Sequence, residues 1–78
     1  MPTILRTGPY RLFCYSSDQH EPAHVHVERD DKKAKYWLKP IILQSSVGFA
    51  RQELIDISRL LERNQELLFK SWNDYFAR

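Results

Sequence analysis

The chain has 78 residues, of which 42% are hydrophobic and 28% are charged. This length suits one domain with a small core, and the composition excludes a disordered chain. Twelve Lys and Arg against ten Asp and Glu give a formal charge of +2, which permits an acidic partner but does not require one. We therefore expect a single domain over residues 1–78.

The sequence predicts a cytoplasmic protein with no membrane partner. Its first residues lack the long apolar segment of a signal peptide, and its apolar runs are far shorter than a membrane span. The single cysteine, Cys14, has no partner for an internal disulfide and lies in an apolar run. We expect a buried, reduced thiol, which is typical of the cytosol.

Polar and apolar residues alternate over the first half of the chain, which predicts strands within residues 3–43. Residues 3–5 and 10–15 form apolar runs, and the alternation is clearest in residues 24–28 and 33–39. The polar residues 29–32 between them suit a hairpin turn. A last short strand at 41–43 is expected to lead into a turn at 45–48. The side chains expected to face the core are Val25, Val27, Ala34, Tyr36 and Leu38.

From about residue 51 the apolar period changes from two to 3.6, which predicts helices over residues 51–76. Leu54, Ile57 and Leu61 recur at helical spacing. Ala50 occupies the N-cap position without a side chain that could cap the helix, whereas Asn64 interrupts the pattern and is expected to cap a second helix. The order predicts an α+β fold: a small, mainly antiparallel three- to four-stranded sheet followed by two C-terminal helices packed on one face.

All three histidines lie in one segment, residues 18–28. The strand alternation puts His24 and His26 on the same outward face, about 6.5–7 Å apart along the strand. His20 lies in the loop before Pro22 and could fold back to join them. Imidazole groups titrate near neutral pH, so they suit general acid and base catalysis, phosphate binding and metal binding.

The outward face of the predicted sheet interleaves cations with aromatic rings. Such a surface suits single-stranded nucleic acid, because bases stack on the rings while Lys and Arg neutralise phosphates. The alternative is an ordinary solvated face whose lysines discourage edge pairing. The candidate nucleic-acid-binding residues are Arg11, Lys33, Lys35, Trp37 and Lys39.

Three parts of the chain resemble the small bacterial proteins of the family catalogued as domain of unknown function 4160 (DUF4160). These parts are residues 1–4, the histidine segment, and residues 48–54 and 64–68 with Trp72. The histidine segment matches the family's His-x-Pro-x-His-x-His-Val pattern at His20, Pro22, His24, His26 and Val27. The resemblance implies no settled reaction. It implies a protein encoded beside a second small protein, in an arrangement like that of toxin–antitoxin pairs.

We therefore expect a component of such a pair, the toxin, that acts on or binds RNA through the outward face. For metal-independent RNA cleavage, His24 and His26 would be the acid–base pair and His20 would assist or bind phosphate. Lys35 or Arg11 would stabilise the charge of the transition state. This interpretation requires no cofactor.

A metal site is the first alternative, in which the histidines hold zinc or another divalent cation. The nitrogen donors would be His20, His24 and His26, with an oxygen from Asp18, Glu21 or Glu28. Spacings of four and two residues are not a standard zinc signature, and the loop must bend to bring His20 in.

A non-enzymatic interaction module is the second alternative, with histidines that serve only the structure. Under each interpretation we expect a small cognate protein as the partner, with a homo-oligomer as a further option. Exposed apolar edges on so small a domain tend to be covered.

Overall fold

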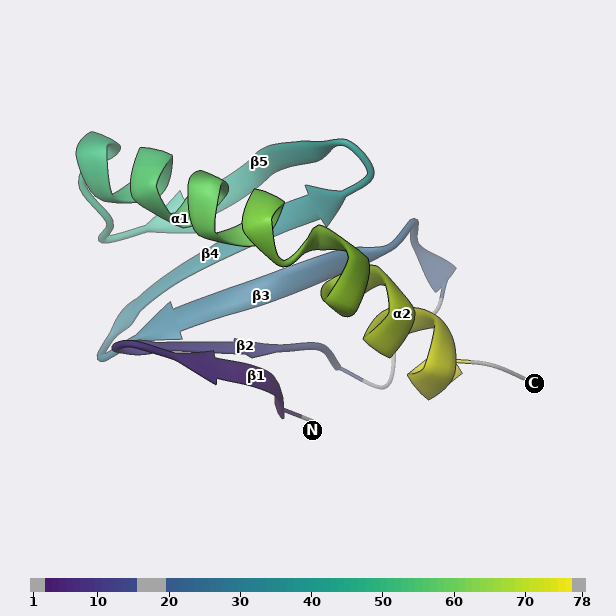
Figure 1. Ribbon diagram of the computed structural model, residues 1–78. Coiled ribbons are helices and arrows are strands. Elements are labelled where there is room, and N and C mark those ends of the chain that lie inside the picture. Colours follow the sequence, from purple (N-terminus) through teal and green to yellow (C-terminus); the bar gives the residue numbers. More distant parts are fainter. Residues whose placement is uncertain (1–2, 16–19, 77–78) are drawn as a thin grey trace.

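The computed structural model describes residues 3–15 and 20–76. Within them, five strands form one antiparallel sheet that two helices follow, so the α+β class is confirmed with one more strand than the three to four expected (Figure 1). The strands keep their chain order in the sheet, so each one pairs with its sequence neighbours. The elements are β1 (Thr3–Thr7), β2 (Tyr10–Phe13), β3 (His24–Arg29), β4 (Lys32–Leu38), β5 (Ile41–Val47), α1 (Arg51–Arg63) and α2 (Gln65–Phe76).

Strand β5 is longer than the sequence predicted. Instead of turning at residues 45–48, it continues to Val47 and pairs with β4 along its whole length, from Leu38 opposite Ile41 to Lys33 opposite Val47. The register shifts at Gln44, which is an extra residue between two paired positions. A bulge of this kind accommodates one extra residue without ending the pairing of the strands. The serines at 45 and 46 are part of the sheet, because they pair with Lys35 and Ala34.

The turns lie where their residues allow the required backbone. Asp30 and Asp31 alone connect β3 to β4, and Asp30 has a φ of 56°. Aspartate tolerates this left-handed conformation better than most residues. Gly48 follows β5 with a φ of 90°, where a Cβ atom would lie 2.9 Å from Cγ of Lys32. The predicted hairpin at residues 29–32 is therefore confirmed.

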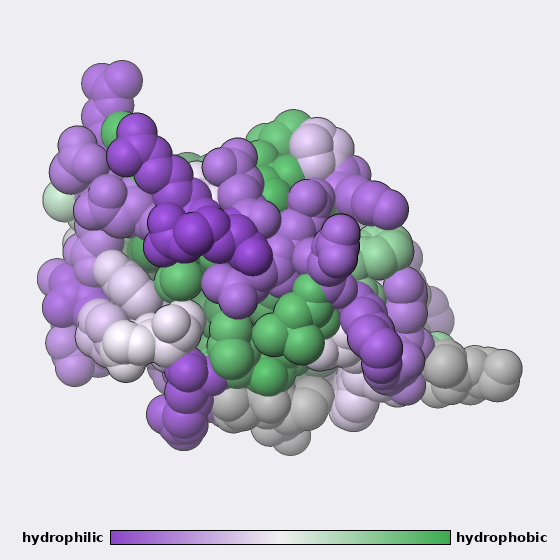
Figure 2. Space-filling view, viewed as in Figure 1, coloured by the Kyte–Doolittle hydropathy of each residue, from purple (hydrophilic) through white to green (hydrophobic). Residues whose placement is uncertain are grey.

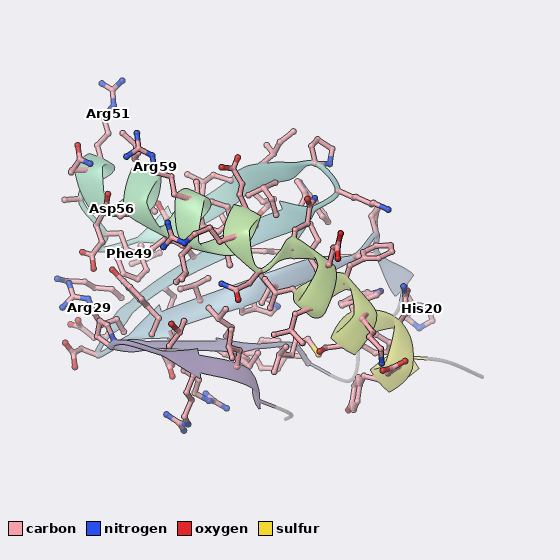
Figure 3. The ribbon with its side chains drawn as sticks, in the orientation of Figure 1. His20, Arg29, Phe49, Arg51, Asp56 and Arg59 are labelled. Atoms are coloured by element: carbon pink, nitrogen blue, oxygen red, sulfur yellow. The ribbon has the colours of Figure 1, made fainter. Side chains whose placement is uncertain are left out.

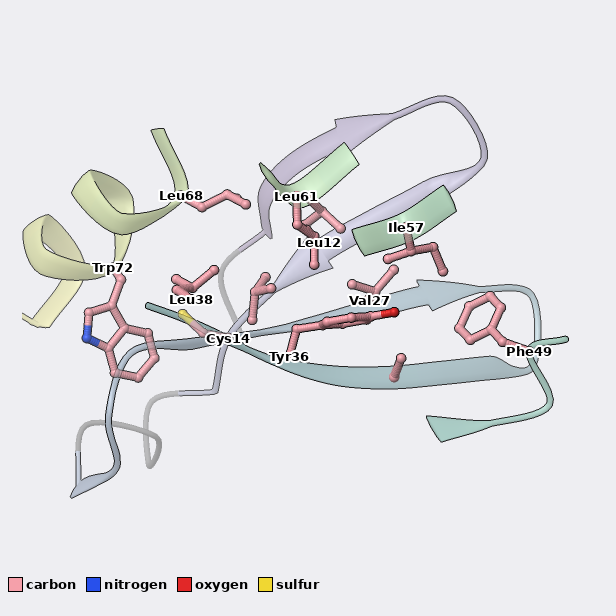
Figure 4. Close-up of a cluster of buried hydrophobic side chains, with 12 residues drawn as sticks. Leu12, Cys14, Val27, Tyr36, Leu38, Phe49, Ile57, Leu61, Leu68 and Trp72 are labelled. Carbon is pink, nitrogen blue, oxygen red and sulfur yellow. The ribbon is translucent and has the colours of Figure 1, made fainter. Parts of the chain in front are cut away.

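Both helices pack on one face of the sheet, as predicted (Figure 1). All five side chains expected to face inward are buried, and they contact the apolar side of the helices (Figure 4). The hydroxyl of Tyr36 donates a hydrogen bond of 2.8 Å to the carbonyl oxygen of Leu54, which joins α1 to the centre of the sheet. The core consists of Leu12, Cys14, Val25, Val27, Ala34, Tyr36, Leu38, Phe49, Ile57, Leu61, Leu68 and Trp72.

The helix ends agree in part with the sequence. Ala50 is the N-cap of α1 and makes no side-chain hydrogen bond, as expected. Asn64 lies between the helices, and its carbonyl oxygen accepts a hydrogen bond of 2.9 Å from the amide of Leu68. Its side-chain Nδ2, however, donates to the carbonyl oxygen of Leu60 at 2.9 Å. The Asn64 side chain thus stabilises the end of α1 rather than the start of α2.

At one end of the molecule, a partly exposed ion pair joins α1 to the sheet. Nε of Arg29 lies 2.7 Å from Oε2 of Glu53, and the Tyr10 hydroxyl donates to the same oxygen at 2.8 Å. The hydrogen bond from Arg29, followed by that from Tyr10, lowers the pKa of Glu53. Burial, together with the bond to Glu53, raises the pKa of Tyr10. Figure 3 shows Arg29 and His20 at opposite ends of the molecule.

The helical layer does not cover the sheet completely. Figure 2 shows polar residues over the helices and an apolar area between them and the β1 edge. Ile4 and Leu5 of β1 are half-buried and pack against the core there. No helix in the described part of the chain is long and apolar enough to cross a membrane.

Candidate functional site

The sheet face opposite the helices, called the open face below, carries side chains in rows across the strands. The alternation predicted from the sequence is confirmed, because Lys33, Lys35 and Trp37 of β4 point away from the core residues between them. Strand pairing puts these three residues opposite outward residues of β3. Read from β2 to β4, the rows are Arg11–Glu28–Lys33, Phe13–His26–Lys35 and His24–Trp37.

Aromatic rings form the β2 side of the open face. The Phe13 ring stacks on the His26 ring with 5.4 Å between centroids and 23° between planes, and Tyr15 lies edge-on to His26 at 4.8 Å. The guanidinium of Arg11 lies 4.4 Å from the Phe13 centroid. Phe13 lies on the open face, but only 3% of it is exposed because these groups cover it. The surface available to a ligand is therefore Tyr15 and the edge of His26.

The exposure of His24 differs most clearly from the prediction made from the sequence. Its register places it on the open face, yet its exposed fraction is 0%. Helix α2 reaches the start of β3, where the Trp72 ring lies 4.9 Å from the His24 ring, and the Trp37 ring lies 5.6 Å from it. Nδ1 of His24 donates a hydrogen bond of 2.9 Å to the carbonyl oxygen of Pro22. With its side chain fully buried, His24 is not accessible to a ligand that binds on the open face.

The other two histidines differ in exposure. His26 is half-buried, and its ring lies 5.2 Å from that of His24. His20 is exposed, and it lies at the end of the molecule opposite Arg29 (Figure 3). Within residues 3–15 and 20–76, no three His, Cys, Asp or Glu side chains are grouped so that they could hold a metal ion. Asp18, which the metal hypothesis also used, lies outside the described residues.

Two of the candidate cations have carboxylate partners. Nζ of Lys35 lies 2.7 Å from Oε1 of Glu21 and 5.0 Å from the Trp37 ring centroid. Arg11 contacts Glu28 at 3.2 Å. The same Glu21 oxygen lies 3.7 Å from Nδ1 of His24. The sequence offered Glu21 only as a metal ligand, because its spacing from Lys35 gives no sign of a contact that the β3–β4 hairpin creates.

A hollow of about 170 Å³ lies on the open face between β3, β4 and β5. His26, Lys33 and Lys35 line it, together with the hydroxyl-bearing Ser45. The sequence did not predict the contribution of β5, because residues 45–47 were assigned to a turn. The complete lining is His26, Lys33, Ala34, Lys35, Ser45, Ser46 and Val47.

Lys39 lies apart from the other candidates, in the turn between β4 and β5. Its Nζ is 4.4 Å from the centroid of Phe69 on α2, and it lines a second, larger pocket. Trp37 lies between the hollow and the larger pocket. It follows Lys35 on the same face of β4, and its side chain lines the larger pocket. The structure thus brings Lys33, Lys35 and His26 together and places Lys39 beyond Trp37.

The family model described as Domain of unknown function (DUF4160) matches residues 10–73. The chain belongs to this family. The match to DUF4160 includes strands β2 to β5, all of α1 and all three histidines. The open face of this DUF4160 protein therefore lies inside the region that the family model describes. No curated protein and no solved structure matches the chain.

Proposed function

We propose that this DUF4160 protein binds single-stranded RNA on its open face, as one component, the toxin, of a toxin–antitoxin type gene pair. The observation that carries the proposal is the hollow in which two lysines, His26 and Ser45 surround one small space. These groups are hydrogen-bond donors or cations of the kind that hold a phosphate. The indole of Trp37 beside them offers a surface on which a base can stack.

The charges favour an anion, but only moderately. The open face and its end carry the cations Arg11, Lys33, Lys35 and Lys39 against two carboxylates, Glu21 and Glu28. A phosphate that binds Lys35 must compete with Glu21, whose side chain is 47% exposed and able to move away. We therefore expect binding that weakens steeply as salt is added, because most of its free energy is electrostatic.

Binding is supported better than cleavage. An acid–base pair of His24 and His26 requires both imidazoles to reach the phosphate, and His24 is fully buried. His26 is the one histidine of the three that lines the hollow. Its position, half-buried against Phe13, suits a fixed donor to a phosphate oxygen. The proposal needs no metal ion.

The second component of the proposal is a small cognate protein encoded beside this one. This part follows from the resemblance to DUF4160 proteins, which implies a two-protein cassette. The physical role we expect for such a partner is to cover the open face and so prevent RNA from reaching the hollow. Copurification of the two proteins, and loss of RNA binding by the complex, would support this arrangement.

The first experiment measures the affinity of the purified protein for a fluorescent single-stranded RNA of about ten nucleotides, by anisotropy at several salt concentrations. Lys33→Gln should weaken binding and reduce the slope of log K against log salt by about 0.7, the value for one phosphate contact on a single strand. Lys70→Gln is the matched control, because Lys70 is exposed on α2 and pairs with Asp74 at 2.8 Å. A DNA strand of equal sequence tests the preference for RNA.

A change in the opposite direction makes the test sharper. Glu21→Gln removes the carboxylate that competes with phosphate for Lys35, so it should strengthen RNA binding. Equal affinities for the wild type, Lys33→Gln and Glu21→Gln, or no RNA binding at all, would overturn the proposal. For the toxin role, growth arrest on expression should occur with the wild type and be reduced by Lys33→Gln but not by Lys70→Gln.

A further inference from the structure

A pocket larger than the hollow lies at the end of the sheet, next to the open face. Its volume is about 450 Å³, within the range of roughly 300–1,000 Å³ that small-molecule sites occupy. The β4–β5 turn, the loop before β3 and helix α2 all contribute to it. Its lining consists of Pro22, Ala23, Trp37, Lys39, Pro40, Ile42 and Phe69.

Backbone contacts hold the walls of this pocket in place. The amide of Leu38 donates a hydrogen bond of 3.0 Å to the carbonyl oxygen of Ala23, which joins the loop before β3 to the end of β4. Nε2 of Gln65 donates to the carbonyl oxygen of Leu38 at 2.6 Å, which joins the start of α2 to the same strand. Two prolines restrict the remaining wall. The pocket is therefore formed before any ligand enters.

The residues that line the pocket favour a ligand with a flat ring and an attached negative group. Trp37 and Phe69 supply two aromatic walls. Each of them has its own cation, because Lys35 lies 5.0 Å from the Trp37 centroid and Lys39 lies 4.4 Å from the Phe69 centroid. The seven lining residues include one lysine and no carboxylate. Aromatic walls favour stacking with a base, and Lys39 in the lining favours its phosphate.

We propose that this pocket binds one unpaired nucleotide, with its base between Trp37 and Phe69 and its phosphate on Lys39. The inference rests on the proposed function and extends it, because it assigns a second subsite to the same RNA. Trp37 and Lys35 are neighbours on one face of β4, about 6.5–7 Å apart along the strand. An RNA strand with one phosphate in the hollow thus passes Trp37 and reaches the pocket with its next nucleotide.

The chemistry of a base with its phosphate is shared by an RNA strand and a free mononucleotide, so the experiment includes both. Two-dimensional NMR of the full chain follows the indole N–H of Trp37, assigned with Trp37→Phe, and the amide of Ala23 during titration. AMP and UMP should shift these signals. Ribose 5-phosphate, which has no base, and adenosine, which has no phosphate, should shift them at least tenfold less at equal concentration.

Two variants on one strand test the site. Ile42→Asp places a negative charge at the mouth of the pocket, on a side chain that is 52% exposed, so the fold should tolerate it. It should weaken both AMP and RNA binding about three- to fivefold, because a carboxylate repels the phosphate. Gln44→Asp makes a similar change on the same strand outside the pocket lining and should change the affinity for AMP less than twofold. Thermal melting checks that both variants fold.

The outcomes separate the inference from the proposed function. Suppose that Lys33→Gln weakens RNA binding, Ile42→Asp does not, and AMP causes no shift. This result would overturn the assignment of a nucleotide to the pocket and leave the proposed function standing. Shifts from AMP without RNA binding would support a nucleotide pocket that takes a free mononucleotide and would overturn the RNA proposal. Weakening of RNA binding by both Lys33→Gln and Ile42→Asp supports both.

Discussion

The imidazole of His24 and the indole of Trp72 lie 4.9 Å apart, although one belongs to the start of β3 and the other to the last turns of α2. This contact closes the end of the sheet and removes His24 from solvent. Replacing the side chain with alanine would open a cavity and remove the hydrogen bond to Pro22. We predict that His24→Ala lowers the free energy of unfolding by about 2–4 kcal/mol, measured by urea denaturation.

His26→Ala is the matched control for this prediction. The His26 ring is only half-buried, so the variant should lose less stability, about 1 kcal/mol, and should still weaken RNA binding because His26 lines the hollow. Loss of RNA binding in His24→Ala would therefore reflect a loss of folding. Loss of RNA binding in a folded His26→Ala variant would reflect a role of His26 in the site. Equal stability of His24→Ala and the wild type would contradict the role assigned to the contact with Trp72.

The ion pair between Arg29 and Glu53 predicts a loss of stability in acid. Hydrogen bonds from Arg29 and then Tyr10 lower the pKa of Glu53 from its ordinary value of 4.5. A lowered pKa in the folded state contributes stability that is present above about pH 4.5 and is lost as the pH falls through the folded pKa. Glu53→Gln should be less stable at neutral pH, and its stability should decline less between about pH 5 and pH 3.

Urea midpoints at several pH values, for the wild type and Glu53→Gln, measure this difference. Asp74→Asn is a suitable control, because Asp74 pairs with Lys70 on the surface of α2 and its side chain is 66% exposed. Surface pairs of this kind contribute little to stability. Parallel pH profiles for the wild type and Glu53→Gln would show that the Glu53 cluster does not contribute to acid sensitivity.

Gly48 allows the chain to leave β5 and enter α1. Its φ of 90° is a conformation that other residues adopt at a cost, and an added Cβ atom would approach Cγ of Lys32 to 2.9 Å. We predict that Gly48→Ala destabilises the fold by about 1–3 kcal/mol. Gly8→Ala is the control for the steric contact, because Gly8 also has a positive φ, 57°, but a Cβ atom there has no neighbour within 4 Å in the described structure. A smaller loss for Gly48→Ala than for Gly8→Ala, measured by thermal melting, would contradict this account.

Removing the hydroxyl of Tyr36 changes only the side of the sheet that the helices cover. Tyr36→Phe removes the 2.8 Å hydrogen bond to the carbonyl oxygen of Leu54 and should cost about 1–2 kcal/mol. RNA affinity should not change, because Tyr36 faces away from the open face. Tyr75→Phe, whose ring is 42% exposed, should leave stability within about 0.5 kcal/mol. A stable Tyr36→Phe variant with weakened RNA binding would argue against the assignment of the two faces.

Local patterns predicted much of the fold. The alternation around Val25 and Tyr36 identified the inward face of two strands, and the spacing of Ile57 and Leu61 identified the buried side of α1, because period alone decides which side chains share a face. The full length of β5 was not predicted. The strand continues past a bulge at Gln44 into a polar run, and pairing with β4 keeps that run in the sheet.

The candidate site was predicted less completely than the fold. The sequence by itself determined the chemistry that the outward side of the sheet carries, since Lys33, Lys35 and Trp37 follow from the two-residue repeat of a strand. Tertiary structure decided which of these groups is accessible. His24 and His26 have the same local pattern, but α2 covers only the first, because its position depends on packing between segments almost fifty residues apart in the chain. Such long-range contacts leave no trace in local spacing.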